Sequence, residues 1–155
     1  MDTREDRGSY VVILRLRLTR RIRVGRLGVV SFLDGWHLYA GSAMACLSAR
    51  IGRHLRRRKK LHWHIDYLRE RADEVAAFPM PSSRRRECEL AGALAKIFPA
   101  GPQGFGCSDC ACPTHLYHSA DDPRRLRAFH LLLERFRAEP PITFTQGRRP
   151  GLRRE

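Results

Sequence analysis

The chain has 155 residues, 43% of them hydrophobic and 30% charged, which excludes wholesale disorder and favours one domain of ordinary size. Its 30 basic and 16 acidic residues give a formal net charge of +14, which favours a polyanionic partner. All but three of the basic residues are arginines, whose planar guanidinium suits phosphate. Genome composition also biases arginine content. No stretch reaches the roughly 18–20 apolar residues of a membrane span, and the charged first ten residues lack a signal peptide's apolar centre, so we expect a cytoplasmic or nucleoid-associated protein with no membrane partner.

The first third of the chain predicts a small sheet with an inserted hairpin. Residues 10–18 are rich in β-branched and apolar side chains, which is typical of a strand. Short apolar runs at 22–24 and 29–32 flank a Gly-Arg-Leu-Gly sequence and predict a hairpin. The Asp-Gly pair at 34–35 is a strong turn signal, and the next strand is predicted over 36–40.

A first helix is predicted to begin near Ala43, with Ser42 as its cap. Leu47, Ile51 and Leu55 recur every four residues and are expected to face the core. A separate stripe on the same helix consists of Arg50, Arg53, His54 and Arg57. This stripe is the first candidate for phosphate contact.

A basic run and a histidine-rich segment follow this helix. The five basic residues at 56–60 either contact phosphate or interact with the helix C-terminus and solvent. The sequence His-Trp-His-Ile-Asp at 62–66 opens a second helix, predicted over 64–71. His62 and Asp66 share a face at spacing i, i+4 while the second histidine does not, so we favour packing and hydrogen bonding over substrate contact or a metal triad.

A strand is predicted over 74–78, with a break at the Pro-Met-Pro sequence that follows it. A third helix, capped by one of the two serines after that break, is predicted to run to about residue 98. Its apolar stripe consists of Leu90, Ala91, Leu94, Ile97 and Phe98. Continued backward, this stripe reaches Glu87, a carboxylate that needs either a cation or an ion-pair partner such as Arg84 or Arg86.

A cysteine- and histidine-rich segment follows a Gly/Pro-rich loop over 99–106. Its five potential ligands are Cys107, Cys110, Cys112, His115 and His118. Thiolates and imidazoles suit tetrahedral zinc, and the first four are the candidate ligands. The cluster lacks the separated ligand pairs of a zinc finger, however, so a tight reduced loop that supports the wall of a site stays open as the alternative.

A last helix is predicted to begin at the Asp-Asp-Pro sequence over 121–123. Its apolar face consists of Leu126, Phe129, His130, Leu133 and Phe136. The predicted fold class is α+β, a small, mainly antiparallel sheet flanked by helices, with an extra hairpin and a C-terminal Cys/His loop plus helix. We expect one domain over 8–138, with its core at 8–98 and the Cys/His loop and last helix at 99–138, followed by a loose basic tail at 139–155.

Two short tyrosine motifs and three later residues carry a family resemblance. Gly-Ser-Tyr at 8–10 opens the first strand and Tyr-Ala-Gly at 39–41 closes a later one, with Arg50 and His54 on the first helix and Glu87 on the third. This order resembles the GIY-YIG nuclease superfamily. The stretches LYAGSA, RIGRHLR, HWHIDYL, ECELA and GFGCSDCACPTHLY resemble an uncharacterised branch of it, members of which occur fused to endonuclease-III-like DNA glycosylases.

The chain departs from the superfamily's pattern in two ways. Ser9 and Ala40 replace the isoleucines of the motifs, but both should point to the sheet face opposite the neighbouring tyrosines. Tyr10 and Tyr39 are 29 residues apart, which is much more than the family usually has. The inserted hairpin between them is expected to reshape the substrate groove.

The resemblance implies hydrolysis of phosphodiester bonds with one divalent metal. Tyr10 would act as general base or as a water-orienting phenol, and Tyr39 would orient the phosphate or the water. Arg50 would neutralise developing charge, and His54 would assist proton transfer or contact the phosphate. Glu87 would hold Mg²⁺ or Mn²⁺, which prefer oxygen ligands.

We therefore expect a metal-dependent endonuclease acting on nucleic acid, DNA favoured over RNA, in a repair or structure-specific context. The residues expected to bind the nucleic acid are Arg53, Arg56, Arg57 and Arg58. The alternative is a non-catalytic nucleic-acid-binding module, stabilised by zinc at the cysteine-rich loop. The fusions seen in similar proteins suggest a DNA-repair enzyme as a partner.

Overall fold

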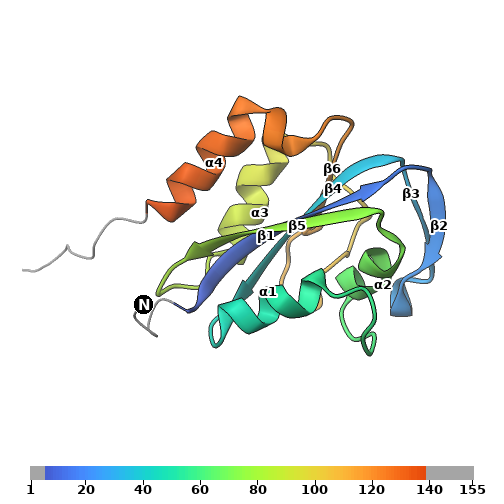
Figure 1. Cartoon of the computed structure of the whole chain (residues 1–155), viewed down its shortest axis with the longest axis horizontal. Coiled ribbons are helices and arrows are strands. Elements are labelled where there is room, and N and C mark those ends of the chain that lie inside the picture. Colours follow the sequence, from blue (N-terminus) through green and yellow to red (C-terminus); the bar gives the residue numbers. More distant parts are fainter. Residues whose placement is uncertain (1–5, 139–155) are drawn as a thin grey trace, which may run out of the picture.

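The computed structural model describes residues 6–138 and confirms the predicted α+β class (Figure 1). Its main sheet is antiparallel throughout, with the order β5-β1-β4-β6. The strands are β1 (Gly8–Leu16), β4 (Gly35–Ala43), β5 (Glu74–Pro81) and β6 (Leu116–Ser119). Helices α1 (Leu47–Leu55) and α2 (His64–Arg71) cover one face, and α3 (Glu87–Ala95) and α4 (Arg127–Arg137) cover the other.

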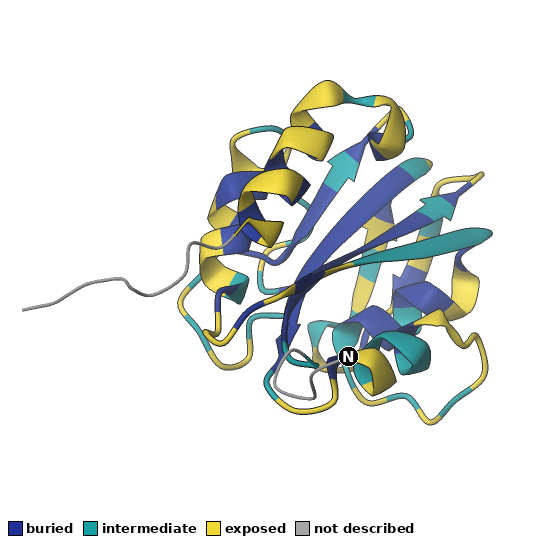
Figure 2. Ribbon diagram, turned by 60° about the vertical axis from the view of Figure 1, so that its left-hand side comes forward, coloured by how far each residue is buried: buried dark blue, intermediate teal, exposed yellow. Residues whose placement is uncertain are grey.

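The two central strands are buried along almost their whole length, because helices cover both sheet faces (Figure 2). Alternate side chains of β1 enter different cores: Val11 and Ile13 pack with α3 and α4, whereas Tyr10 and Val12 pack on the side of α1 and α2. Ala40 lies in the first of these cores, on the face opposite Tyr10, as predicted.

The predicted hairpin forms a separate two-stranded sheet. Its strands are β2 (Arg20–Arg23) and β3 (Val29–Phe32), joined through the 3₁₀ turn η2 (Gly25–Leu27). Ile22 and Phe32 are buried in one core with Ile65 and Leu68 of α2. The hairpin therefore extends the side of the molecule on which α2 lies.

The start of α1 differs from the prediction. The β1–β4 ladder continues to Ala43, so Ser42 is a strand residue and does not cap the helix. Instead, Asp6 supplies the cap from outside: its carbonyl accepts from the Leu47 N–H at 2.9 Å, and its carboxylate accepts from the Ser48 N–H at 2.8 Å. A cap contributed by a residue far away in the sequence could not be found from local pattern.

The buried face of α1 is also rotated from the predicted one. Leu47 is buried, but Leu55 is exposed and His54 takes a place in the interior. Arg57 lies beyond the end of the helix and so does not continue its stripe. The rotation brings the His54 ring toward the sheet.

Further differences concern the second half of the chain. Strand β5 continues through both prolines, which an edge strand tolerates because a missing N–H need not face a neighbour. Helix α3 begins at Glu87, later than a cap at either serine predicts; the Ser82 N–H bonds to the Arg7 carbonyl instead and prolongs the extended segment. Strand β6 was not predicted at all.

The last helix begins later than predicted. A 3₁₀ turn, η3 (Pro123–Arg125), precedes α4, and Asp122 accepts a hydrogen bond from the Arg124 N–H at its start. Helix α4 buries Phe129 and Phe136 as predicted, whereas His130 is exposed. The predicted loose tail at 139–155 lies outside the described residues.

Among residues 6–138, no helix combines the length and the apolar character that crossing a membrane requires.

Candidate functional site

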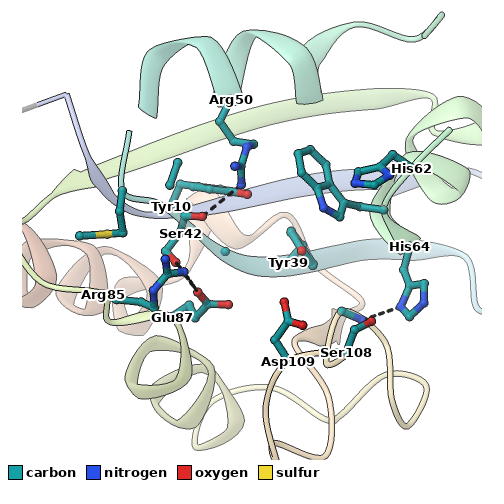
Figure 3. A pocket seen from close by; sticks show the side chains of 15 residues that line it. Tyr10, Tyr39, Ser42, Arg50, His62, His64, Arg85, Glu87, Ser108 and Asp109 are labelled. Carbon is teal, nitrogen blue, oxygen red and sulfur yellow. Dashed lines mark hydrogen bonds and ion pairs between the residues drawn. The ribbon is translucent and has the colours of Figure 1, made fainter. Parts of the chain in front are cut away.

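A cavity of about 290 Å³ opens beside the ends of β1 and β4, between α1, α2 and α3 (Figure 3). Its wall includes four residues that the sequence singled out: Tyr10, Tyr39, Arg50 and Glu87. They come from two strands and two helices on opposite faces of the sheet. The wall is predominantly polar, which suits a charged ligand better than an apolar one.

Tyr10 is placed by its cross-strand neighbour Gly41. A Cβ on Gly41 would lie 2.5 Å from the Tyr10 hydroxyl, so only glycine lets the phenol cross this strand. The hydroxyl is hydrogen-bonded to Nε2 of His54 at 2.8 Å. Burial raises the pKa of Tyr10 to about 12, which outweighs the opposing effect of the Arg50 guanidinium. Tyr10 is therefore a neutral phenol at pH 7.

His54 lies behind Tyr10 and does not line the cavity. Burial, reinforced by the charge of Lys59, lowers the pKa of His54 to about 3, so the imidazole is neutral. Its position allows it to affect the Tyr10 hydroxyl but not to contact a phosphate in the cavity directly. Tyr39 is also buried, and burial raises its pKa well above the ordinary value.

The arginines of α1 are divided between the cavity and the interior. Arg50 donates to the Ser42 carbonyl at 3.1 Å and lies 4.4 Å above the Trp63 ring, at the cavity wall. Arg53 forms a bidentate pair with Asp66, 2.9 Å at each oxygen. A nucleic acid would have to compete with that pair to reach Arg53.

The predicted hydrogen-bonding role of the His-Trp-His-Ile-Asp segment is confirmed at Asp66. Besides Arg53, its carboxylate accepts from the N–H groups of His62 and Trp63 at 2.8 and 2.9 Å. Burial alone would raise the pKa of Asp66, but these donors bring it below the ordinary value. His62 and His64 nevertheless line the cavity as well, so the segment serves both packing and the site.

The basic run beyond α1 lies at the surface. Arg56, Arg57 and Arg58 are exposed, and Arg57 donates to the Glu70 carbonyl at 2.9 Å. These side chains are more accessible to a polyanion than Arg53, which is only partly exposed and is paired with Asp66.

Glu87 is the first residue of α3 and faces the cavity (Figure 3). Its Oε1 accepts from the Ser42 hydroxyl and from Arg85 Nη1, the latter at 3.0 Å. The predicted partners Arg84 and Arg86 are not the ones observed, because Arg86 pairs with Glu89 on the next part of the helix. On the other side, Oε2 lies 3.9 Å from Nδ1 of His115. The carboxylate is therefore held by hydrogen bonds at Oε1, while Oε2 faces His115 without a hydrogen bond and the group still reaches the cavity.

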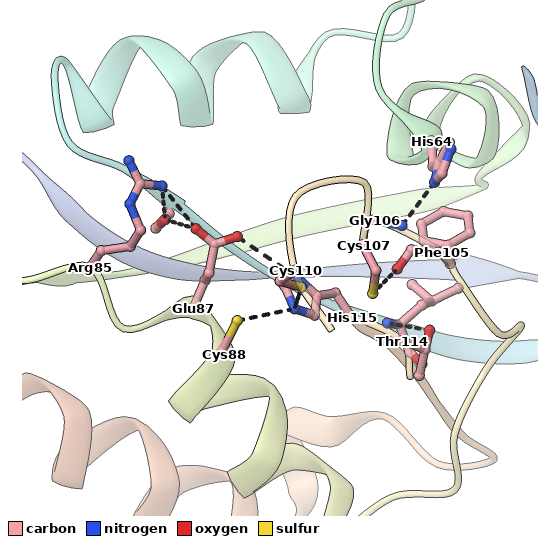
Figure 4. Close-up of polar contacts among 12 residues, drawn as sticks. His64, Arg85, Glu87, Cys88, Phe105, Gly106, Cys107, Cys110, Thr114 and His115 are labelled. Atoms are coloured by element: carbon pink, nitrogen blue, oxygen red, sulfur yellow. Dashed lines mark hydrogen bonds and ion pairs between the residues drawn. The ribbon is translucent and has the colours of Figure 1, made fainter. Parts of the chain in front are cut away.

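A second cluster lies directly behind Glu87 (Figure 4). The ligand atoms of Cys88, Cys110, Cys112 and His115 all lie within 4.8 Å of one another and could hold a metal ion. Three of the four predicted ligands belong to this group, whereas Cys107 lies outside it and Cys88 from α3 takes the fourth place.

The backbone explains this replacement. Gly104 and Gly106 adopt positive φ angles of 82° and 72°, and the resulting turns direct the Cys107 thiol to the Phe105 carbonyl at 3.3 Å. His118 belongs to β6, where it bonds to the Asp34 carbonyl. The signal that could have revealed Cys88 is its place next to Glu87, the residue that the helix pattern had already marked.

Several other residues contribute to the cavity, and no site role was assigned from the sequence to Ser42, Arg85 or Trp63. Ser42 and Arg85 hold Glu87, Trp63 supports Arg50, and Asp109 reaches the cavity from the cysteine-rich loop (Figure 3). Ser108 and Asp109 belong to the cysteine-rich loop, and the alternative interpretation of that loop had already placed them in the wall of a site.

The fold and site thus define an α+β domain with a polar cavity backed by a Cys/His cluster. The sequence model of a family described as a domain of unknown function, DUF123, matches residues 9–138, and the chain belongs to this family. Neither the curated proteins nor the solved structures contain a match to the chain.

Proposed function

We propose that this protein is a metal-dependent endonuclease that hydrolyses phosphodiester bonds in nucleic acid, with DNA as its substrate in a repair or structure-specific context. The observation that carries the proposal is the convergence of Tyr10, Tyr39, Arg50 and Glu87 on one polar cavity. These residues lie on four separate elements, and the resemblance to the GIY-YIG nucleases had selected them from the sequence alone.

Glu87 is the residue that would hold Mg²⁺ or Mn²⁺. Its carboxylate fits a hard cation, because it reaches the cavity and its nearest basic partner, Arg85, is largely exposed and free to move toward solvent. When bound, the ion would supply a Lewis acid that polarises the phosphate.

The chain's own residues would bind and orient the reacting groups. Arg50, stacked on Trp63, would neutralise negative charge on the phosphate, and Tyr39 would orient that phosphate or the water. Because the Tyr10 phenol is neutral, its role in the proposal is to orient the attacking water, with His54 fixing the direction of the hydroxyl. Tyr10 is therefore not proposed to act as a phenolate.

The Cys/His cluster would take a different ion. We propose zinc there, in a structural role, because three thiols and an imidazole are soft ligands that fill a tetrahedral shell. Substrate would have no open position on that ion.

The direct test is a cleavage assay with Mg²⁺ or Mn²⁺ on single-stranded, duplex and branched DNA and on matching RNA. Glu87→Gln should abolish cleavage and leave folding and binding nearly intact, because the charge is lost but the shape is kept. Glu89→Gln is the matched control on the same helix, since Glu89 pairs with Arg86 outside this cavity. Cleavage by Glu87→Gln at the wild-type rate would refute the role of Glu87.

Tyr10→Phe tests the proposed role of the Tyr10 hydroxyl. It should retain affinity and lose turnover, because one oxygen is removed from a buried ring. Tyr117→Phe is the control: Tyr117 is a buried tyrosine in the same sheet whose hydroxyl donates to the Thr114 carbonyl, away from the cavity.

Arg50→Ala should lower the rate by at least ~10²-fold, the scale of losing one charge-stabilising donor.

A non-catalytic nucleic-acid-binding module is the second candidate, and the exposed basic run of Arg56, Arg57 and Arg58 favours it, since these side chains can contact phosphate without any catalytic group. If that candidate is correct, the wild-type protein binds branched nucleic acid tightly and cleaves none of the substrates, and Tyr10→Phe changes little.

A further inference from the structure

We propose that Cys88, Cys110, Cys112 and His115 form a zinc centre that clamps the cysteine-rich loop to α3 and orients Glu87 through His115. The zinc centre stands on its own geometry. Its consequence for Glu87 rests on the proposed function, because it concerns the residue that would hold the catalytic ion.

The distances from His115 to two of the cysteines are close to those around one tetrahedral ion. With Zn–S near 2.3 Å and Zn–N near 2.0–2.1 Å, neighbouring ligand atoms around zinc are separated by about 3.5–3.8 Å. Nε2 of His115 lies 3.5 Å from Sγ of Cys110 and 3.9 Å from Sγ of Cys88. All three cysteines are free thiols rather than disulfides, so each is available as a thiolate.

The chemistry of the set selects the metal. Mg²⁺ and Ca²⁺ require oxygen ligands, which this group does not supply, whereas Cys₃His is a common set for structural zinc. Binding would release the thiol protons to solvent.

The unused nitrogen of His115 supplies independent support. The residue is 1% exposed, and its Nδ1 has no hydrogen-bond partner in residues 6–138, although it lies 3.9 Å from Oε2 of Glu87. Zinc-bound histidines characteristically donate their other ring N–H to a carboxylate. With Nε2 on zinc, the proton must sit on Nδ1, facing Glu87 (Figure 4).

Backbone hydrogen bonds fix the position of His115 between the cysteine-rich loop and β4. Its N–H donates to the Phe105 carbonyl at 2.9 Å, and its carbonyl accepts from the Ala40 N–H at 3.0 Å. The backbone of His115 is thus anchored to β4, next to Tyr39. A zinc ion bound to Nε2 of His115 would link this residue to α3 through Cys88, which follows Glu87 in the sequence.

The clamp would also shape the cavity. Ser108 and Asp109 line the cavity from the loop that holds Cys110 and Cys112. This loop reverses direction at two glycines with positive φ and has no strand or helix of its own before β6. A cross-link to α3 would add to the backbone hydrogen bonds that hold this loop, such as that from the Gly104 N–H to the Pro113 carbonyl at 2.7 Å.

The first experiment measures zinc without reference to nuclease activity. Protein purified under reducing conditions should contain one zinc per chain, and cobalt replacing it should give the visible absorption of a tetrahedral thiolate site. Cys88→Ser should lose the metal, whereas Cys107→Ser and Cys46→Ser should keep it. A folded, reduced wild-type protein that holds no zinc and binds no cobalt would overturn the proposal. So would a Cys107→Ser protein that loses zinc while Cys88→Ser retains it.

The second experiment isolates the link to Glu87. His115→Cys replaces one zinc ligand by another but removes the N–H that faces the carboxylate. It should keep one zinc and weaken Mn²⁺ binding, measured by electron paramagnetic resonance, about tenfold, the lower end of the effect of removing such an outer partner. Unchanged Mn²⁺ affinity in the zinc-loaded variant would refute the positioning role of His115.

These results separate the inference from the proposed function. One zinc per chain with no cleavage of any substrate would leave the zinc centre standing and refute the nuclease. Cleavage by a protein that binds no zinc would do the reverse.

Discussion

His54 and Tyr10 form a buried polar pair whose protonation states follow from the cost of charge in the interior. Both groups are almost completely shielded from water, and the hydrogen bond between them joins two neutral partners. Burial pushes the two pKa values apart, that of His54 to about 3 and that of Tyr10 to about 12. Across the whole neutral range, neither side chain carries a charge.

The lowered pKa of His54 predicts a loss of stability in acid. The pKa of a histidine in an unfolded chain is near 6.5. Between that pH and about 3, His54 is therefore protonated in the unfolded chain but neutral in the folded protein. The contribution of His54 is therefore complete above pH 6.5 and is lost as the pH falls. At pH 4.5 the loss amounts to about 2–3 kcal/mol.

His54→Gln tests this sign, because glutamine can still meet the Tyr10 hydroxyl but does not titrate. Urea denaturation at pH 7 and pH 4.5 should show a smaller drop in unfolding free energy for the variant than for the wild type. His118→Gln serves as a control on β6. An equal drop in His54→Gln and in the wild type would contradict the buried neutral state.

At the scale of elements, α1 and α2 share an apolar core and are also joined by polar groups. Arg53 of α1 is paired with Asp66 of α2, and Arg69 of α2 donates to the Leu55 carbonyl at 2.7 Å, at the C-terminus of α1. The second contact satisfies a carbonyl that helix geometry leaves without a partner. Arg50, Trp63 and the cavity wall depend on this junction.

Asp66→Asn should therefore destabilise the protein by about 3 kcal/mol, because it breaks a buried ion pair and leaves Arg53 without its counter-charge. The measurement is the free energy of unfolding in urea. Glu70→Gln is the matched control, since Glu70 is an exposed carboxylate on the same helix. A loss no larger than that of the control would show that Arg53 finds other partners.

At the scale of the whole molecule, the dominant property is the charge of +14. A polyanion that meets such a surface displaces counterions, so its affinity falls as salt rises. The exposed run Arg56, Arg57 and Arg58 lies just beyond α1, the helix that carries Arg50 to the cavity.

Replacing Arg56, Arg57 and Arg58 by glutamine should flatten the plot of log K against log salt for duplex DNA by about 2–3 units, one phosphate contact for each arginine. Filter binding over a range of salt concentrations measures this slope. The control triple, Arg125, Arg127 and Arg135, is exposed around α4 on the other face of the sheet (Figure 1). If only the control triple changes the slope, the nucleic acid binds to the α4 side.

Elements with local signals were predicted best. Helix α2 begins at His64 and ends at Arg71 as predicted, because the Asp66 carboxylate caps it from within. The start of α1 and strand β6 were missed because each depends on a distant partner: Asp6 in the first case and β4 in the second. Similarly, the sequence marked Glu87 by periodicity but could not identify Arg85 as its ion-pair partner.

The sequence by itself determined the α+β class, and the periodicity of α3 marked Glu87, since such patterns act within a few residues. Tyr10, Tyr39 and Arg50 were marked by the resemblance to a nuclease superfamily. The tertiary structure decided which of these side chains meet. It buried His54 against Tyr10, turned Arg53 inward to Asp66 and brought Cys88 to the cysteine-rich loop in place of Cys107. The physical reason is that burial and ligand geometry depend on contacts between segments far apart in the chain, which no local pattern encodes.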